Sequence, residues 1–464
     1  MRLLIIGGSD AGISAALRAR ELAPSTQVQV IVRDRFPNFS ICGLPFFLSG
    51  ETPDWHHLAH RTTDDIRREG IDLLLEHEAI GIDPQHKIVT VSSLDGEHAL
   101  LVYDKLVIGT GAESANPPIS GLGLPGVHMM RWMSDAFRVK AYLDQRLPRS
   151  VVIVGAGYIG LEMADALTRL GIDVTVIEYL PQVLRTVDVK LGRLVRAELE
   201  RHGVKVITST AVASIEGIGD QLSVMGREGV LQTTDMVLVA AGARPETSLA
   251  ESAGVKLGPT GAIRVSRRME TSVADVFAAG DCVETWHRVR GGYSYLPLGT
   301  TAHKQGRIAG ENAVGGTAEY AGSLGTQAVK VFDLVVARTG LRDDEAAEIG
   351  FRPLTVDFET WDHKVYYPRA QKLRIRLTAD QESGKLLGAQ LVGHRTSEVS
   401  KRVDILAAAL FHEMSVEELS ELDLSYTPPL SSPWDPIQMA AQAWESKAWS
   451  LASGIQEKVQ WDKL

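Results

Sequence analysis

A single cysteine near the N-terminus has the sequence context of a redox-active thiol. Cys42 lies about 30 residues beyond an N-terminal glycine-rich loop, and Cys282 is the only other cysteine of the chain. A redox reaction at Cys42 therefore cannot close a local disulfide. It must instead pass through a mixed disulfide with a small thiol, a persulfide or a sulfenic acid.

The residues around Cys42 leave its reactivity open. Pro37 and Asn38 precede it and Gly43 follows it, so we expect a turn where a second crossover helix begins. A helix N-terminus would lower the pKa of the thiol and provide thiolate at neutral pH. A small buried hydrophobic side chain is the alternative, and this is the role that we expect for Cys282.

The loop at residues 155–160 has the G-x-G-x-x-G pattern of dinucleotide-binding domains. It follows an apolar strand and precedes a helix, so its backbone amides can bind a pyrophosphate. Glu178 provides the acidic residue expected about 20 positions further on. Its carboxylate accepts a hydrogen bond from a free ribose 2′-hydroxyl and repels a 2′-phosphate, so the motif favours NADH over NADPH. A purely structural glycine turn would not need this acid.

A second glycine loop, at residues 7–12, is less regular. Ser9 stands where the stricter pattern has its second glycine. The acidic position falls near Val32, and the nearest carboxylate is Asp34. We still expect a dinucleotide here, because Asp281 follows a later apolar strand and is suited to bind the ribityl part of a flavin.

The two loops lie about 150 residues apart, which indicates duplicated nucleotide-binding domains rather than a short tandem repeat. Alternation of strands with helices predicts parallel sheets with crossover helices. After about residue 326 the segments become strand-rich, so we expect a third, α+β domain. The tail that carries Trp444, Trp449 and Trp461 is either an interface helix or frayed chain. The expected helices lie at 13–22, 161–170, 302–312 and 397–411.

The composition is that of an ordinary globular protein, with 44% hydrophobic and 23% charged residues among 464. A net charge of −10 gives no general attraction to nucleic acid or anionic lipid, so neither is an expected partner. No apolar run is long enough to cross a membrane, and two cysteines fit a reducing compartment, so we expect a cytoplasmic protein. His56, His57 and His60 lack metal-ligand spacing, so no metal site is expected.

Together these features resemble the FAD-dependent pyridine nucleotide-disulfide oxidoreductases. The resemblance is strongest to the single-cysteine branch, which includes CoA-disulfide reductase, NADH oxidase and NADH peroxidase, and it extends over about residues 1–440. Phe47 stands where the two-cysteine branch has its second cysteine, so that branch is excluded. The motifs that carry the resemblance occur in the family's order at 7–12, 42–45, 110–112, 155–162, 278–282, 330–333, 366–368 and 426–429.

The resemblance implies an α/β fold with two Rossmann-like dinucleotide-binding domains, for FAD and for NAD, and a C-terminal α+β dimerisation domain. The FAD-binding domain would comprise residues 1–115 and 250–325, the NAD(P)H-binding domain residues 116–249, and the dimerisation domain residues 326–464. The implied cofactors are FAD and NADH, with NADPH left open and CoA as a substrate or as an adduct of Cys42. The implied partners are a small-molecule disulfide or thiol and a second copy of the chain, in a homodimer.

The candidate site residues follow from the motifs and the resemblance. The catalytic candidates are Cys42 and three tyrosines, Tyr366, Tyr367 and Tyr426, since CoA-disulfide reductases use tyrosines of the other subunit's C-terminal domain next to the cysteine. Tyr158 is either a packing residue or a side chain that lies over the flavin and moves aside for the nicotinamide. The cofactor-binding candidates are Gly7, Gly8, Ser9, Asp10, Ala11, Gly12, Asp34, Thr110, Gly111, Asp281, Ala302, Gly155, Gly157, Tyr158, Ile159, Gly160, Glu178 and Gly242.

The resemblance favours reduction of a disulfide or persulfide, as in CoA-disulfide reductase, over peroxide chemistry. Peroxidase-like and oxidase-like members carry a histidine in the first glycine loop, whereas Asp10 holds that place here. Two departures weaken the match: Asn38 replaces the family's serine four residues before the cysteine, and no distinct basic cluster for the 3′-phosphate of CoA is evident. Three alternatives therefore stay open. The first is an NADH oxidase or peroxidase that cycles Cys42 through a sulfenic acid, and the second is a flavoprotein reductase of an electron-carrier protein. The third is a reductase of metal or metalloid species.

Overall fold

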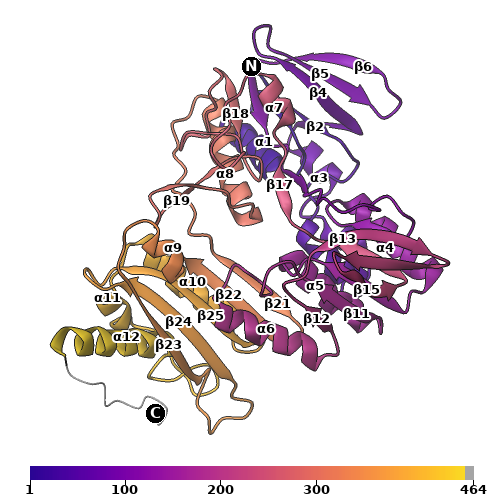
Figure 1. Cartoon of the computed structure of the whole chain (residues 1–464). Helices are drawn as coiled ribbons and strands as arrows, with labels where there is room; N and C mark the ends of the chain where they lie inside the picture. Colours follow the sequence, from indigo (N-terminus) through magenta and orange to yellow (C-terminus); the bar gives the residue numbers. More distant parts are fainter. Residues whose placement is uncertain (455–464) are drawn as a thin grey trace. The chain divides into compact units, whose positions relative to one another are not determined.

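The computed structural model describes residues 1–454, which form two compact units (Figure 1). The four-segment division expected from the sequence stays a prediction. No helix in the described residues is long and apolar enough to span a membrane. The first unit contains Met1–Val151, Ala213–Trp286 and Gly292–Gly322, and the second contains Val152–Val212, His287–Gly291 and the chain from Ser323 on.

A five-stranded parallel sheet forms the centre of the first unit. Its strand order is β18-β7-β1-β2-β3, and each neighbouring pair is parallel. The strands are short apolar runs that lie in the core of the unit, as expected for a sheet with crossover helices. β18 pairs with β7 although it lies far along the chain, so the chain returns to this sheet as the sequence predicts. The strands are β1 (Arg2–Ile6), β2 (Gln27–Val32), β3 (Ile71–Leu75), β7 (Lys105–Ile108) and β18 (Val276–Ala278).

Two helices of the first unit pack closely against each other. They are α1 (Asp10–Leu22) and α8 (Gly299–Ala313). A Cβ on Gly306 would lie 2.2 Å from the carbonyl oxygen of Ala11, so this approach requires glycine. Both helices begin three residues before the start expected from the sequence, because their first turns include polar and glycine residues that precede the apolar pattern.

Smaller elements complete the first unit. β4, β5 and β6 form an antiparallel sheet, β8 pairs with β17, and β9 pairs in parallel with β16. The bounds of the strands are β4 (His77–Asp83), β5 (Ile88–Ser93), β6 (His98–Val102), β8 (Ala112–Ser114), β9 (Val127–Met129), β13 (Val212–Ile218), β14 (Gln221–Gly226), β15 (Gly229–Thr234), β16 (Met236–Val239), β17 (Ala243–Pro245), β19 (Thr285–His287) and β20 (Gly292–Ser294). The bounds of the helices are α2 (Leu44–Leu48), α3 (Thr63–Arg68), α4 (Met133–Arg146) and α7 (Ser248–Ser252).

The second unit begins with a strand, a glycine loop and a helix that repeat the start of the chain. β10 (Ser150–Val154) leads into α5 (Tyr158–Arg169), β11 (Asp173–Ile177), α6 (Val189–Arg201) and β12 (Lys205–Ile207), and β11 pairs with β12 in parallel. α5 starts at Tyr158 rather than at residue 161, because Gly157 is its N-cap. Tyr158 therefore lies in the first turn of a helix.

An antiparallel sheet and its helices form the C-terminal part of the second unit, which confirms the α+β expectation. The strand order is β21-β22-β25-β24-β23. α10 packs on β22 and β25, and α12 packs on β23 and β24. α10 starts two residues later than expected, because Glu398 before it is left-handed with φ +53°. The elements are β21 (Gln327–Val331), β22 (Leu334–Gly340), α9 (Asp343–Ala347), β23 (Pro353–Trp361), β24 (Lys372–Asp380), β25 (Leu386–His394), α10 (Val399–Phe411), α11 (Val416–Ser420) and α12 (Pro436–Ser453).

The tryptophans of the tail have different environments. Trp444 and Trp449 both lie on α12, so this part of the tail is helical. Trp444 is buried in the core of the C-terminal part and donates a hydrogen bond to the carbonyl oxygen of Leu354 at 2.7 Å, whereas Trp449 is exposed. Trp461 lies outside the described residues.

The tight glycine loop of the first unit gives a stability prediction. A Cβ on Gly12 would lie 1.8 Å from the carbonyl oxygen of Gly7, so Gly12→Ala should destabilise the protein by about 2 kcal/mol or more. Thermal unfolding should show a lower midpoint for this variant. Gly217→Ala is the control, because no atom lies within 4 Å of its added Cβ. Equal midpoints for the two variants would contradict the prediction that a Cβ on Gly12 destabilises the fold.

Candidate active site

The two glycine loops have the same backbone geometry. The first glycines, Gly7 and Gly155, have φ values of +106° and +107°. A Cβ on the last glycine, Gly12 or Gly160, would lie 1.8 or 2.0 Å from the carbonyl oxygen of the first. Each loop therefore brings a helix N-terminus close to the end of its strand, and this arrangement leaves backbone amides for a pyrophosphate.

The geometry explains why Ser9 is compatible with the first loop. Ser9 and Gly157 are the N-caps of α1 and α5, and both have an extended backbone. No atom lies within 4 Å of a Cβ built on Gly157. A side chain at this point of the loop therefore meets no steric obstacle within the chain. Ile159, two residues further on, leaves 37% of its surface exposed beside the second loop.

Glu178 is held at the second loop by two backbone amides. Its Oε2 accepts a hydrogen bond from Ala156 N at 2.7 Å, and its Oε1 accepts one from Leu180 N at 2.8 Å. The carboxylate is thereby fixed next to the glycine turn. A carboxylate oxygen accepts more than one hydrogen bond, so a ribose hydroxyl fits here as well.

The first loop has no acid at the matching position. Gly7 N donates to Ile31 O and Gly155 N donates to Ile177 O, so Val32 is the equivalent of Glu178. Val32 is buried, and a Cβ on Gly8 would lie 2.6 Å from it, so a ribose contact cannot come from this residue. Asp34, two residues further, lines a surface hollow, where its Oδ1 accepts from Phe36 N at 2.8 Å.

The groups around the first loop fit a flavin dinucleotide. Burial raises the pKa of Asp10 above its ordinary value, and the nearby charge of Asp281 raises it further. His60 and His303 act in the opposite direction and lower this pKa. The two carboxyl groups, Asp10 and Asp281, therefore interact electrostatically. Asp281 Oδ2 pairs with Arg131 at 3.1 Å, which leaves Oδ1 for a hydroxyl ligand. These carboxylates accompany the amides of the glycine loop, as a ligand with hydroxyl and phosphate groups requires.

The remaining predicted residues of the first unit are held by backbone bonds. Thr110 Oγ1 donates to Glu246 O at 2.6 Å, and Gly111 O accepts from Glu246 N at 3.0 Å. Gly242 has φ +110°, and its carbonyl accepts from Ala115 N at 2.8 Å. Ala302 is buried in the first turn of α8.

Cys42 lies exposed in a 3-10 turn that spans Ile41–Gly43. A Cβ on Gly43 would lie 2.5 Å from Leu58 Cδ2, so glycine lets this turn pack on the next segment. α2 begins two residues after the cysteine, so the expected helix is present. It has only five residues, however, and a helix this short has few peptide dipoles to lower the pKa of the thiol.

Backbone hydrogen bonds attach the Cys42 segment to the first glycine loop. Asn38 N donates to Gly8 O at 2.7 Å, and His60 N donates to Asn38 O at 2.9 Å. Asn38 has φ +58° and is buried, and its side-chain oxygen has no hydrogen-bond partner in the described residues. An unsatisfied buried oxygen beside the loop can accept a hydrogen bond from a ligand. The exposed thiol is therefore four residues from a direct contact with the expected nucleotide loop.

Aromatic packing fixes the same segment from the other side. Phe36, Phe39, Trp55 and Phe137 contact one another with ring centroids 5.2 to 5.7 Å apart. Such pairs stabilise beyond the area that they bury. The turn that carries Cys42 is therefore anchored to a rigid cluster.

Cys282 is unsuited to thiol chemistry. It is fully buried, as expected, and burial raises the pKa of its thiol to about 11. It contacts the carbonyl oxygen of Ala279 at 3.4 Å. A thiol with this pKa stays protonated at neutral pH, so Cys42 is the only candidate nucleophile of the two.

The histidines near the N-terminus are exposed, with His56 and His57 on a 3-10 turn and His60 just beyond it. A group with ligand-type geometry lies elsewhere, at Glu198, His202 and Asp333, and sequence reasoning missed it. Arg201 and Arg395 pair with its two carboxylates. Both carboxylates of this group therefore take part in ion pairs with arginines.

Tyr158 and Glu162 lie one turn apart on α5 and so face the same way. Burial raises the pKa of Glu162 to about 7, against the effect of Lys330 and with a contribution from Asp165. Burial also raises the pKa of Tyr158, whose hydroxyl accepts a hydrogen bond from Thr186 at 3.3 Å. Sequence reasoning placed Glu162 in a motif without a role, although its spacing from Tyr158 was a usable signal.

The three predicted tyrosines lie on exposed loops of the second unit. Their exposed fractions are 72% for Tyr366, 43% for Tyr367 and 44% for Tyr426. A hydrogen bond between Tyr366 and Tyr426 raises the pKa of Tyr426, so the structure brings these two together. Tyr367 contacts His363 instead.

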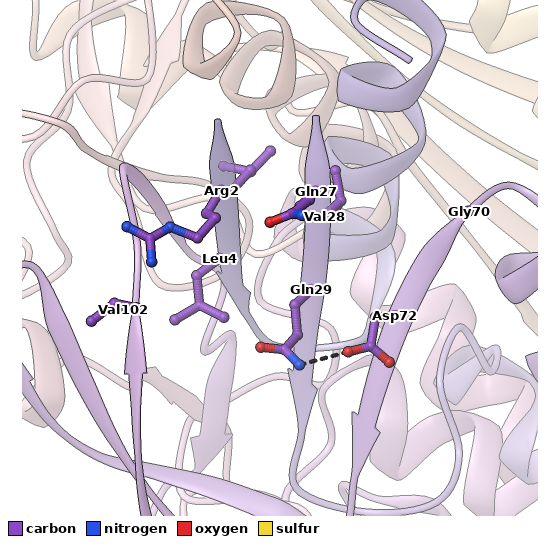
Figure 2. Close-up of a pocket in the computed structure, with 9 residues that line it drawn as sticks. Arg2, Leu4, Gln27, Val28, Gln29, Gly70, Asp72 and Val102 are labelled. Carbon is purple, nitrogen blue, oxygen red and sulfur yellow. Dashed lines mark hydrogen bonds between the residues drawn. The ribbon is translucent and has the colours of Figure 1, made fainter. Parts of the chain in front are cut away.

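One surface pocket of the first unit is lined by none of these residues (Figure 2). It is lined by the first residues of β1, β2 and β3, where Gln29 donates to Asp72 at 2.6 Å. Nucleotides bind at the opposite, carboxyl ends of parallel strands. This pocket therefore contributes nothing to the candidate site.

Comparisons with known proteins match the chain to one family. The family described as pyridine nucleotide-disulphide oxidoreductase matches residues 1–306, and its dimerisation domain matches residues 326–436. A Methanocaldococcus jannaschii protein named NADH oxidase is 34% identical over 445 residues, covering 95% of this chain and 98% of that protein. A Pyrococcus furiosus protein named NAD(P)H sulfur oxidoreductase (CoA-dependent) is 34% identical over 442 residues, covering 95% and 98%.

The structure also resembles solved structures over its whole length. An NAD-dependent persulfide reductase from A. fulgidus has a TM-score of 0.93 and 36% identity, and the match covers 100% of this chain and 86% of that one. The two family matches cover the segments that hold both glycine loops, Cys42 and the C-terminal sheet. The chain belongs to the pyridine nucleotide-disulphide oxidoreductases, as an FAD- and NAD(P)H-dependent enzyme with a C-terminal dimerisation domain.

Proposed function

We propose that this enzyme reduces a low-molecular-weight disulfide or persulfide, most directly that of coenzyme A, at Cys42 with electrons from NADH. The observation that carries the proposal is the exposed Cys42 thiol on a turn tied by Asn38 to the first glycine loop. The names of the relatives support it, because one is called a CoA-dependent sulfur oxidoreductase and another a persulfide reductase.

Different residues of the chain would hold the two cofactors. The first loop, with Asp281, would hold FAD, and the second loop, with Glu178, would hold NADH. When bound, FAD would accept hydride from NADH and deliver two electrons to sulfur. Tyr158 covers the nicotinamide position and moves aside when NADH enters.

Cys42 carries the sulfur chemistry. Its resting form is a mixed disulfide with CoA, and two electrons cleave that bond to give the Cys42 thiolate and a CoA thiolate. The Cys42 thiolate then attacks a sulfur of CoA disulfide, forms the mixed disulfide again and expels a second CoA thiolate. The net reaction consumes one NADH and one proton and gives NAD⁺ and two CoA thiols for each disulfide.

A proton donor assists the departing thiolate. The raised pKa of Tyr426 keeps its hydroxyl protonated at neutral pH. We assign it, with Tyr366, to the cysteine of the other copy in a homodimer, which the dimerisation domain supports.

An NADH oxidase or peroxidase that cycles Cys42 through a sulfenic acid is the second candidate, because one relative carries the name NADH oxidase. Oxygen and peroxide consumption, compared with CoA-disulfide reduction at equal NADH, separates the two functions. Faster consumption of oxygen or peroxide would favour this candidate.

Cys42→Ser should lose CoA-disulfide reduction by more than about a hundredfold, because the nucleophile is gone. NADH should still bleach the flavin of this variant without oxygen, since hydride transfer does not need the cysteine. Cys282→Ser is the control and should keep CoA-disulfide reduction, because the buried Cys282 thiol should not take part in the reaction. Retained disulfide reduction in Cys42→Ser would contradict the proposal.

Tyr426→Phe should lower the rate of disulfide reduction about tenfold or more, because the departing thiolate loses a proton donor. Reduction of the flavin by NADH should keep its wild-type rate in stopped-flow measurements. Tyr179→Phe, an exposed tyrosine of the same unit, is the matched control. A loss in the NADH step instead would remove Tyr426 from this role.

The rate of flavin reduction by NADH should rise with pH through about 7, where Glu162 ionises. The carboxyl is neutral below this pH and anionic above it, and the anion stabilises the positive charge of oxidised nicotinamide. Stopped-flow pH profiles test this. Glu162→Gln should give a flat pH profile across the same range. If the inflection near pH 7 is unchanged in this variant, it arises from another ionisable group.

A further inference from the structure

The hydroxyl of Tyr158 has a partner that the proposed function does not use. Thr186 Oγ1 donates a hydrogen bond to it at 3.3 Å. Tyr158 lies in the first turn of α5, and Thr186 lies in the segment that precedes α6. This distance is long for two hydroxyl groups, so the bond is at the weak end of its range and breaks at a small cost. A contact of this strength suits a side chain that must move.

Thr186 itself is held firmly. Arg338 Nη1 donates to the carbonyl oxygen of Thr186 at 2.6 Å. Arg338 Nη2 donates to Gly340 O and to Glu345 Oε2, both at 2.8 Å. The arginine is 8% exposed, and a buried guanidinium with charge-assisted bonds on both nitrogens has little freedom. Thr186 is therefore fixed relative to β22.

The neighbours of Thr186 are anchored independently. Leu184 N donates to Ala156 O at 2.9 Å, within the second glycine loop. Asp188 N donates to Gln390 Oε1 at 2.6 Å. Because the segment is held at both ends, removal of the Thr186 hydroxyl should leave its backbone in place.

We propose that Thr186 is a latch that holds Tyr158 over the nicotinamide position, and that Arg338 is the positioning residue that sets this latch. The inference rests on the proposed function, in which Tyr158 covers that position. The latch adds a cost to the opening of Tyr158, so it weakens the binding of the nicotinamide nucleotide. Breaking it should strengthen binding.

The equilibrium dissociation constant of NAD⁺, measured by titration of the oxidised holoenzyme, tests the latch without turnover. Thr186→Val should lower it about threefold, as expected for one weak hydrogen bond. Tyr158→Phe should lower it equally, and the double variant should show no further change, because both substitutions remove the same bond. Thr186→Ser keeps the hydroxyl and should restore wild-type affinity.

Two variants separate positioning from a general structural effect. Arg338→Lys should change NAD⁺ affinity in the wild-type background but not in the Thr186→Val background. Thr168→Val is the matched control, because the Thr168 hydroxyl on α5 has no hydrogen-bond partner in the described residues, and it should leave affinity unchanged.

The possible failures are distinguishable. An unchanged dissociation constant in Thr186→Val, or an additive effect with Tyr158→Phe, would overturn the latch. If Tyr158→Ala also leaves NAD⁺ affinity unchanged, Tyr158 does not cover the nicotinamide position, and that part of the proposed function fails as well.

Discussion

One backbone hydrogen bond connects the chemistry of this enzyme to its fold. Asn38 N donates to Gly8 O at 2.7 Å, which joins the Cys42 segment to the first glycine loop. In this position Asn38 has a left-handed backbone conformation, with φ +58°. Asparagine is one of the few residue types that adopt this conformation at low energetic cost. The asparagine at this position, where the resemblance leads us to expect a serine, therefore suits the local backbone conformation. Together with the aromatic packing of Phe36 on Trp55, this bond fixes the turn that carries Cys42.

The same local geometry is used twice in the chain. Both glycine loops bring a helix within contact of a strand end, but only the second carries an acid at the matching position. The first has Val32 there, packed against Gly8, and the carboxylates that we expect to serve this loop are Asp34, two residues further on, and Asp281, which follows β18. This asymmetry is consistent with different nucleotides at the two sites, since FAD and NADH share a pyrophosphate and differ in what lies beyond it.

Much of this architecture was predictable from the sequence because it depends on local patterns. Apolar strands before glycine turns predicted the parallel sheets, and the order of the motifs along the chain indicated the family. Helix starts were less predictable, since the first turn of α5 contains Gly157 as a cap and Tyr158 outside the apolar pattern. The roles of the site residues stay predictions.

Features that depend on distant contacts were not accessible from the sequence. The pKa of Glu162 depends on burial next to Lys330, which lies in the C-terminal part of the chain. The contact of Thr186 with Tyr158 depends on the position of Arg338, and no spacing rule relates residues this far apart. Sequence patterns therefore propose candidate reacting groups, whereas the residues that contact and position these candidates are found only from coordinates.

Anaerobic titration of the holoenzyme with NADH is the sharpest test of electron exchange between Cys42 and the flavin. The enzyme is first incubated with CoA disulfide and then freed of excess disulfide. Each subunit should then consume two equivalents of NADH, one for the mixed disulfide on Cys42 and one for the flavin, and release one CoA thiol. Consumption of a single equivalent without release of thiol would contradict this exchange.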